Sequence, residues 1–346
     1  MRCLVVQTAF LGDVILTVPL LDLLRRDPRI SRTFVVAAPP GAGFLEEQGV
    51  ADRVITYDKR GVDAGVGGMV RVIRELRELS VDVALVPHRS FRSAFLSFAA
   101  RARRRVGFDV SGGRSLLTET VPYGAFPHEV ERVASLARPL GIEFPAGRIP
   151  FELSVPGLAG DELSSVLSEL GADSLGGAVV VAPGSRWATK RWLPERFAQA
   201  ARLLADRLST DVVVVGAEEE ADVGALVKEQ AGPAAVDLTG ALPMGQLLAL
   251  VSGAKLVLSN DSAVTHIAAG LGVPVVTVFG PTVPAQGYAP YTERARVAQT
   301  ELACRPCGRH GSDSCPLGTM NCMKGVSVDD VVSRALDLVR EEPANA

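Results

Sequence analysis

The chain has 346 residues, of which 47% are hydrophobic and 22% are charged, with a formal net charge of −3. This composition excludes a disordered or fibrous protein, and the length predicts two domains. Only 5% of the residues are aromatic, which argues against a base-stacking surface for nucleic acid, and five cysteines are too few for a disulfide framework.

The distribution of charged and apolar residues limits the compartments and partners to expect. No stretch supplies the roughly 18 uninterrupted apolar residues of a membrane-spanning helix. Asp13 and Asp22 interrupt the N-terminal apolar region, unlike the apolar core of a secretory signal. We therefore expect a cytoplasmic protein with at most peripheral contact with a membrane. Residues 1–150 carry a net charge of +5 and the remainder −8, so an anionic partner is expected on the N-terminal half.

Short apolar runs alternate with helical periodicity along the chain, which is typical of parallel sheets covered by helices. Because the pattern occurs twice, we predict two doubly wound α/β domains, residues 1–155 and 156–346, joined in the Pro- and Gly-rich segment Phe144–Gly160. A last helix is predicted after Ser327. The predicted strands are Cys3–Gln7, Thr33–Ala38, Arg53–Tyr57, Val81–Val86, Ala178–Ala182, Asp211–Val215, Lys255–Ser259 and Pro274–Phe279, and the main helices are Val14–Arg26, Val70–Leu79, Pro194–Leu208, Ala221–Ala231, Met244–Val251 and Ala263–Ala269.

Ligands of such sheets bind where strands end and helices begin. The first predicted strand is followed by Gly12 and Asp13. Asp13 can be a general base that faces a ligand, or only a carboxylate at a helix N-terminus.

Two turns in the second half suit a nucleotide. The turn Pro183-Gly184-Ser185, followed by Lys190, is typical of a phosphate cradle, although it lacks the Walker pattern. The alternative is a solvated turn with Trp192 in the core. After the next predicted strand, Glu219 and Glu220 can accept hydrogen bonds from ribose hydroxyls, or can simply favour the dipole of the following helix.

The densest group of polar side chains closes the strand Lys255–Ser259. Asp261, Ser262 and His266 converge there on a helix N-terminus, which is suited to an anion and to sugar hydroxyls. His266 can also be a satisfied structural histidine.

Two further groups have a chemical and a structural interpretation. Cys304, Cys307, Cys315 and Cys322 include one pair at metal-ligand spacing, so a zinc or iron–sulfur site is the alternative to buried structural thiols. In the basic half, Arg60 and the group 88–93 can bind acidic sugars or phosphate, or can form a solvated surface. The run Arg101–Arg105 is interpreted as solvated surface. The residues of group 88–93 are His88, Arg89, Ser90, Phe91, Arg92 and Ser93.

In order and spacing, these motifs resemble the ADP-heptose:lipopolysaccharide heptosyltransferases, a GT-B glycosyltransferase family. The resemblance is collinear over nearly the whole chain, and the segment Cys315–Met323 is similar to the second heptosyltransferase of the inner core. The other matching motifs are Leu11-Gly12-Asp13, Pro183-Gly184 with Lys190-Arg191-Trp192, Asn260-Asp261-Ser262 with His266, and Phe279-Gly280-Pro281-Thr282.

The resemblance implies a GT-B fold, in which two Rossmann-like domains face a central cleft. The N-terminal domain then binds the acceptor, the C-terminal domain binds the nucleotide-sugar donor, and the last helix can pack back on the N-terminal domain. Asp13 and Lys190 are implied as catalytic residues, and Arg60, Arg89, Ser90 and Arg92 as acceptor-binding residues. The implied donor-binding residues are Ser185, Lys190, Glu220 with Glu219 as the fallback, Leu242 and Met244 at the adenine, and Asp261, Ser262, Ala263 and His266.

We therefore expect an inverting glycosyltransferase without cofactor or metal, which moves a heptose from ADP-heptose to the anionic, lipid-linked inner core of lipopolysaccharide at the inner face of the inner membrane. Another donor or acceptor within the family, a GT-B-like nucleotide-sugar epimerase, and a non-catalytic nucleotide-sugar-binding protein are the alternatives.

Overall fold

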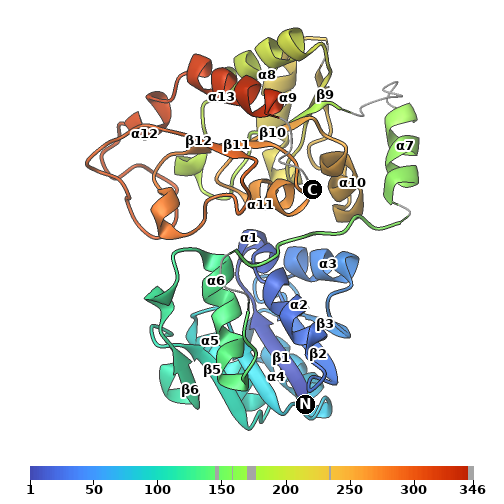
Figure 1. The fold of residues 1–346 in the computed structure, drawn as a ribbon, viewed down its shortest axis with the longest axis vertical. Helices are drawn as coiled ribbons and strands as arrows, with labels where there is room; N and C mark the ends of the chain where they lie inside the picture. The colour runs from blue at the N-terminus through green and yellow to red at the C-terminus, as the bar shows by residue number, and fades with distance from the viewer. Residues whose placement is uncertain (145–147, 158, 170–176, 234, 342–346) are drawn as a thin grey trace. The chain divides into compact units, whose positions relative to one another are not determined.

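The computed structural model describes residues 1–144, 148–157, 159–169, 177–233 and 235–341. The chain divides into two compact units, Met1–Phe151 and Glu152–Ala346, here called unit 1 and unit 2. The described part of each unit contains a six-stranded, entirely parallel sheet flanked by helices (Figure 1). The two doubly wound α/β domains predicted from the sequence are therefore confirmed as a fold class.

The sheet of unit 1 has the strand order β3-β2-β1-β4-β5-β6, so the order reverses between its two central strands. Strand β1 is central, since β2 and β4 pair with its two edges, and it is buried from Cys3 to Gln7 because helices cover both faces of a parallel sheet. The strands are β1 (Arg2–Gln7), β2 (Arg32–Ala37), β3 (Arg53–Thr56), β4 (Val83–Val86), β5 (Arg104–Phe108) and β6 (Glu119–Val121). The α-helices are α1 (Leu11–Ile15), α2 (Val18–Arg26), α3 (Pro39–Gln48), α4 (Gly65–Glu78), α5 (Phe91–Ala99) and α6 (Glu129–Ala134), and the 3₁₀ segments are η1 (Arg114–Leu116), η2 (Tyr123–Ala125) and η3 (Ser135–Leu140).

The sheet of unit 2 repeats this topology in the order β12-β11-β10-β7-β8-β9, and its order reverses between β7 and β10. Such a reversal opens a crevice at the carboxyl ends of the central strands, where ligands bind in doubly wound folds. The strands are β7 (Val179–Ala182), β8 (Val212–Val214), β9 (Ala235–Asp237), β10 (Leu256–Asn260), β11 (Val275–Phe279) and β12 (Ala295–Gln299). The helices are α7 (Ala159–Glu169), α8 (Pro194–Leu208), α9 (Ala221–Ala231), α10 (Met244–Ser252), α11 (Ala263–Gly270), α12 (Asn321–Lys324) and α13 (Val328–Arg340), with η4 (Ala188–Lys190), η5 (Glu218–Glu220) and η6 (Pro284–Gln286).

The long first helix predicted at Val14–Arg26 is wrong, because the structure has two helices there, α1 and α2. Pro19 lies in the first turn of α2, where its missing N–H is tolerated but where it could not continue α1. Thr17 lies between the two helices as the N-cap residue of α2, and its hydroxyl donates to the Asp13 carbonyl at 2.8 Å. The break therefore confines Asp13 to a short helix directly after β1.

The last helix, α13, begins at the predicted cap, where Asp330 N donates to the Ser327 hydroxyl at 3.1 Å. Its apolar face, with Val331, Ala335 and Leu338, is buried in the core of unit 2 together with residues of α8 and β12. The apolar face of α13 is therefore part of the core of unit 2.

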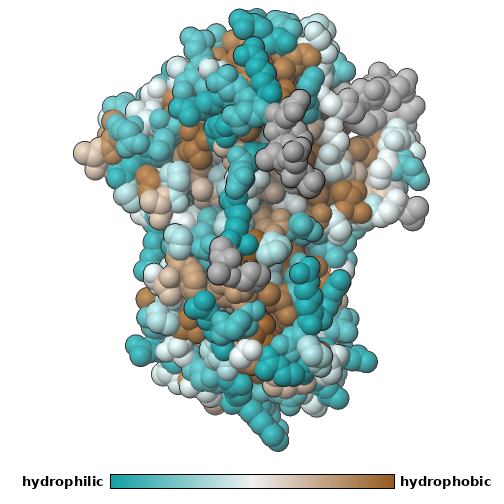
Figure 2. All heavy atoms as spheres, viewed as in Figure 1, coloured by the Kyte–Doolittle hydropathy of each residue, from teal (hydrophilic) through white to brown (hydrophobic). Residues whose placement is uncertain are grey.

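No helix in the described ranges is both long and apolar enough to span a membrane. Figure 2 shows hydrophilic and hydrophobic side chains mixed over the visible faces of both units. Scattered exposed apolar residues are ordinary for a folded protein, whereas a contiguous group of them marks a functional surface.

Candidate active site

The central feature of unit 2 is a buried ion pair at the ends of its strands. Lys190 Nζ, from η4 after β7, lies 2.6 Å from Asp261 Oδ2, directly after β10, and the two side chains are only 13% and 6% exposed. The Thr282 hydroxyl, after β11, donates to the same oxygen at 2.7 Å. Three turns that are far apart in sequence therefore meet at one carboxylate.

Asn260 holds this arrangement together. Its Nδ2 donates to the Pro183 carbonyl at 2.7 Å, and its Oδ1 accepts a hydrogen bond from the Trp192 backbone at 2.9 Å. Both partners belong to the loop between β7 and α8, so the last residue of β10 fixes the loop that carries Ser185 and Lys190. Sequence reasoning included Asn260 in a motif but did not foresee this positioning role.

Glu220 lies closer to this loop than Glu219 does. A Cβ atom on Gly184 would lie 2.1 Å from the Glu220 carboxylate, so the carboxylate occupies the space that a side chain at Gly184 would fill. Glu220 also accepts a hydrogen bond from the Ala217 backbone at 3.0 Å. Glu219 is exposed. The glycine at the end of β7 therefore creates the place for the Glu220 carboxylate between two strand ends.

The other predicted donor-site residues lie on the loops around the ion pair. Ser262 is the N-cap of α11, yet its hydroxyl makes no capping bond and is buried without a hydrogen-bond partner in the described structure. His266 is the fourth residue of α11 and is 3% exposed, and Ser185 is also buried. Ala263 opens α11 and is half-buried.

Leu242 and Met244 lie further along the chain, immediately before and at the start of α10. Both are half-buried apolar side chains. Among the described interactions, none joins them to Lys190 or Asp261.

In unit 1, Asp13 stands in the first turn of α1, immediately after the central strand β1. Gln7, the last residue of β1, donates from Nε2 to the Thr17 hydroxyl at 3.0 Å, and Thr17 donates to the Asp13 carbonyl. These bonds fix the backbone that presents the Asp13 carboxylate, which remains partly exposed.

A hydroxyl-rich group surrounds His88 at the end of the neighbouring strand β4. His88 Nδ1 lies 3.0 Å from both the Thr8 and the Ser93 hydroxyls. Burial lowers the pKa of His88 to about 4, and the positive charges of Lys59 and Arg89 act in the same direction. The imidazole is therefore neutral at physiological pH, and it links the β1–α1 loop to the start of α5.

Four cations surround this group: Lys59, Arg60, Arg89 and Arg92. The Lys59 ammonium donates to the Thr8 carbonyl at 2.7 Å, and its pKa is lowered by burial and by repulsion from Arg60 and Arg92. None of the ion pairs in the described ranges includes any of the four. Lys59 and Arg89 are half-buried, whereas Arg60 and Arg92 are exposed. Grouped cations without a carboxylate partner are typical of a site for an anionic ligand.

The remaining acceptor-site candidates have local roles as well. Ser90 caps α5 by accepting from the Ser93 backbone at 3.2 Å. Arg89 lies over the ring of Tyr123 at 4.1 Å from its centroid, and Arg60 lies 5.6 Å from that of Phe10. The structure thus brings the predicted acceptor-site residues to the same end of the unit 1 sheet.

The cysteine segment has a different role from the two predicted from its spacing. Cys304 and Cys307 are exposed, which excludes a set of four buried structural thiols. The described residues also contain no group of three or more His, Cys, Asp or Glu arranged to hold a metal ion. Burial and the neighbouring thiols of Cys304 and Cys315 raise the pKa of Cys307, so the thiols lie near one another, but in the described ranges they are not arranged as a metal site.

What the segment does is pack on the loop of Lys190. Thr189 and Ser312 exchange hydrogen bonds, of 2.8 Å from the Thr189 hydroxyl to the Ser312 carbonyl and 2.8 Å from the Ser312 backbone to the Thr189 hydroxyl. The ring of His310 stacks on Trp187 with centroids 5.5 Å apart. Nothing in the sequence indicated this contact, because its partners lie more than a hundred residues apart.

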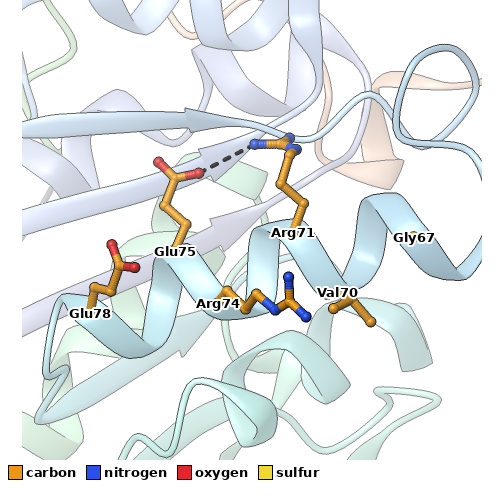
Figure 3. Close-up of a pocket in the computed structure, with 6 residues that line it drawn as sticks. All are labelled: Gly67, Val70, Arg71, Arg74, Glu75 and Glu78. Atoms are coloured by element: carbon orange, nitrogen blue, oxygen red, sulfur yellow. Dashed lines mark hydrogen bonds and ion pairs between the residues drawn. The ribbon is translucent and has the colours of Figure 1, made fainter.

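An open cavity on α4, shown in Figure 3, contains none of the predicted site residues. Arg71 and Glu75 form an ion pair across one turn of α4 at 3.3 Å. The lining residues are Gly67, Val70, Arg71, Arg74, Glu75 and Glu78.

Two doubly wound α/β units with polar groups at their strand ends are the architecture of the two-domain, GT-B glycosyltransferases, although fold alone does not assign an activity. A family model described as glycosyltransferase family 9 (heptosyltransferase) matches residues 69–316, and the chain belongs to this family. It is therefore a glycosyltransferase.

Two curated relatives and one solved structure show how far the similarity extends. Lipopolysaccharide heptosyltransferase 2 of Salmonella typhimurium is 28% identical over 285 residues, which cover 80% of this chain and 75% of the relative. Lipopolysaccharide heptosyltransferase 1 of Pseudomonas aeruginosa is 28% identical over 329 residues, 89% of this chain and 86% of the relative. The structure of the Escherichia coli ADP-heptose lipopolysaccharide heptosyltransferase II aligns over 98% of both chains with a TM-score of 0.79 at 22% identity, a likeness of fold.

Proposed function

We propose that this heptosyltransferase transfers a heptose from ADP-heptose to the inner-core oligosaccharide of lipopolysaccharide, with inversion and without a metal ion. The observation that carries the proposal is the buried Lys190–Asp261 pair between the strand ends of unit 2, next to the first turn of α11. A cation and a helix N-terminus together suit a diphosphate. The name of the solved relative, an ADP-heptose heptosyltransferase, supports the choice of donor.

The donor is held, in this proposal, by residues of unit 2 alone. Ser185 and Lys190 bind the diphosphate, with the buried hydroxyl of Ser262 and the ring of His266 at the start of α11. Glu220 accepts hydrogen bonds from the ribose hydroxyls, since its carboxylate lies against Gly184 and Gly216 at two strand ends. The other donor contacts are assigned to Asp261 and Ala263 at the sugar and phosphates and to Leu242 and Met244 at the adenine.

The reaction requires a base at the acceptor and charge stabilisation at the leaving group. An acceptor hydroxyl oxygen attacks the anomeric carbon of the heptose while the bond from that carbon to the diphosphate oxygen breaks. Asp13 takes the hydroxyl proton, and ADP leaves with the bonding electron pair. Lys190 and the N–H groups at the start of α11 stabilise the negative charge on ADP, which is the role that a metal ion has in other transferases.

The acceptor site is assigned to unit 1. Its cations Arg60, Arg89 and Arg92 and the hydroxyl of Ser90 suit the acidic groups of a lipid-linked core oligosaccharide, which is expected at the inner face of the inner membrane. This assignment is supported by the ion pairs of the described residues, none of which includes Arg60, Arg89 or Arg92.

Product analysis tests the proposal directly. The purified protein is incubated with ADP-heptose, with and without a heptose-deficient core acceptor, in the presence and absence of EDTA. We expect release of ADP and a glycosylated acceptor only when the acceptor is present, and equal rates with EDTA. An altered sugar nucleotide formed without acceptor would instead indicate an epimerase, and an intact donor in every reaction would indicate a binding protein. Turnover with a different sugar nucleotide, but not ADP-heptose, would reassign the donor within the family.

A further inference from the structure

Helix α5 of unit 1 exposes a row of phenylalanines. Phe91 is 58% and Phe98 50% exposed, and Phe95, between them, is half-buried. The rings of Phe91 and Phe95 are stacked with centroids 6.4 Å apart. The opposite side of the helix, with Ala94 and Leu96, is fully buried. The outward row of rings is thus not part of the core of unit 1. Transfer of these rings from water into an apolar environment would lower the free energy.

Arginines flank this row on the elements packed against α5. The guanidinium of Arg105 lies over the ring of Phe98, 5.5 Å from its centroid. Arg77 of α4 donates to the Ala99 carbonyl at 2.9 Å, at the end of α5. Arg114 is exposed on η1, and the preceding Gly113 lies directly against Phe91 and Ala94.

Few negative charges oppose them. Between residues 87 and 118 the sequence has seven arginines and one carboxylate, Asp109, which accepts a hydrogen bond from the Tyr123 backbone at 3.0 Å. On the neighbouring α4, Glu75 is paired with Arg53 and Arg71, and Glu78 is exposed. Arg104 is paired with Glu119 at 2.8 Å. The surface around the phenylalanines is therefore basic.

We propose that this face, the α5 surface, docks on a bilayer that contains anionic phospholipids. The α5 surface is defined as Phe91, Phe95 and Phe98 with Arg77, Arg105 and Arg114. Aromatic rings beside long cationic side chains suit the boundary between lipid headgroups and acyl chains. The rings insert into the apolar part, and the guanidinium groups bind the phosphates. Three rings bury little apolar surface, so electrostatic attraction by the arginines must supply part of the binding free energy. Binding should therefore be reversible and should weaken with added salt.

Charge complementarity favours a bilayer over a second copy of the chain. Two copies that meet through this face would bring their arginine clusters together, which costs free energy unless counter-charges are present. An anionic lipid surface supplies those counter-charges. The proposal extends the proposed function, since a lipid-linked acceptor is presented at such a surface, but the docking itself does not depend on the sugar that is transferred.

The test is co-sedimentation of the full chain with vesicles of phosphatidylcholine alone or of phosphatidylcholine with phosphatidylglycerol. We expect binding to the mixed vesicles that falls with added salt, and little binding to phosphatidylcholine. The double variant Phe95→Ser/Phe98→Ser should lower the partition coefficient about tenfold or more, and Arg114→Gln should lower it by a smaller factor. Leu317→Ser, which removes a 64% exposed apolar side chain from unit 2, is the matched control and should bind as the unchanged protein does.

Folding and catalysis are measured separately from docking. Each variant is checked for its thermal midpoint, its ADP affinity and its turnover of a water-soluble, delipidated acceptor, so that a loss of vesicle binding at unchanged ADP affinity is specific to the surface. Equal binding of the double variant, or equal binding to both kinds of vesicle, would overturn the proposal. So would concentration-dependent self-association that the double variant abolishes, because a second copy would then occupy the face.

Discussion

The two units share one topology but differ in the charge balance at their strand ends. In unit 2 the principal cation, Lys190, is already paired with Asp261, and Thr282 completes the group. In unit 1 the cations Lys59 and Arg92 repel each other and have no carboxylate partner among the described ion pairs. A site that is balanced before its ligand arrives is rigid and preorganised, whereas one with excess charge gains most from an anion. The difference fits a donor site in unit 2 and an acceptor site in unit 1.

The largest expected effect separates turnover from donor binding. Asp13→Asn keeps the size and hydrogen-bonding ability of the side chain but removes the base. We expect turnover to fall about 10²- to 10⁴-fold, the range of general-base assistance. ADP affinity, measured by calorimetry, should remain unchanged, because Asp13 belongs to unit 1. Turnover within a factor of two of the unchanged protein would remove Asp13 as the base.

The second prediction tests whether unit 2 alone holds the diphosphate. Lys190→Ala should weaken ADP binding about 10- to 100-fold, because a charge-assisted hydrogen bond is lost. It should also destabilise the fold by about 3 kcal/mol, since Asp261 is left buried without a counter-charge.

The double variant Lys190→Ala/Asp261→Asn is the control for that second effect. Thermal or denaturant unfolding should show most of the stability restored, whereas calorimetry should show no recovery of ADP affinity. If stability and ADP affinity recover together, the Lys190–Asp261 pair stabilises the fold and does not bind the nucleotide, which would contradict the assignment of the donor site.

Glu219 and Glu220 provide a matched pair for the nucleotide contact. Because Glu220 lies against Gly184 and Glu219 is exposed, Glu220→Gln should weaken ADP binding about tenfold. Glu219→Gln should leave it unchanged within a factor of two. The assignment depends on the order of these two effects, and a larger loss in the Glu219 variant would reverse it.

The strands of both sheet centres could be predicted from the sequence because strands buried on both faces are continuous apolar runs. The helices α8 and α9 follow their predicted bounds for a similar reason, since an apolar face repeats with helical periodicity. Pro194 opens α8 and Gly232 follows the end of α9. The edge strands β6 and β9 have only three residues each, too few to show a period. Strand β5 begins with two arginines, so it was included in a predicted solvated surface.

Some features of the candidate site could likewise be predicted from local sequence, whereas others depend on tertiary packing. Motifs at the ends of predicted strands indicated Lys190 and Asp261, because parallel strands bring their carboxyl ends to one edge. The bond between Thr189 and Ser312 and the hydrogen bonds of Asn260 to the β7–α8 loop depend on tertiary packing, which no local pattern reports. The exposed row on α5 was missed because a helix with Phe91 and Phe98 has the sequence of a buried one, and only its packing shows which face is covered.

The last prediction tests the neutral imidazole of unit 1 through stability and not through ligand binding. The pKa of His88 is about 4 in the folded protein against an ordinary value of 6.5. Between these two values the unfolded chain binds a proton that the folded protein excludes, so the free energy of unfolding should fall as the pH drops from about 6.5 to about 4 and level off below. In denaturant unfolding at several pH values, His88→Gln should flatten this part of the profile. A His88→Gln variant that keeps the pH profile of the unchanged protein would show that the ring is not held neutral by burial among the cations of unit 1.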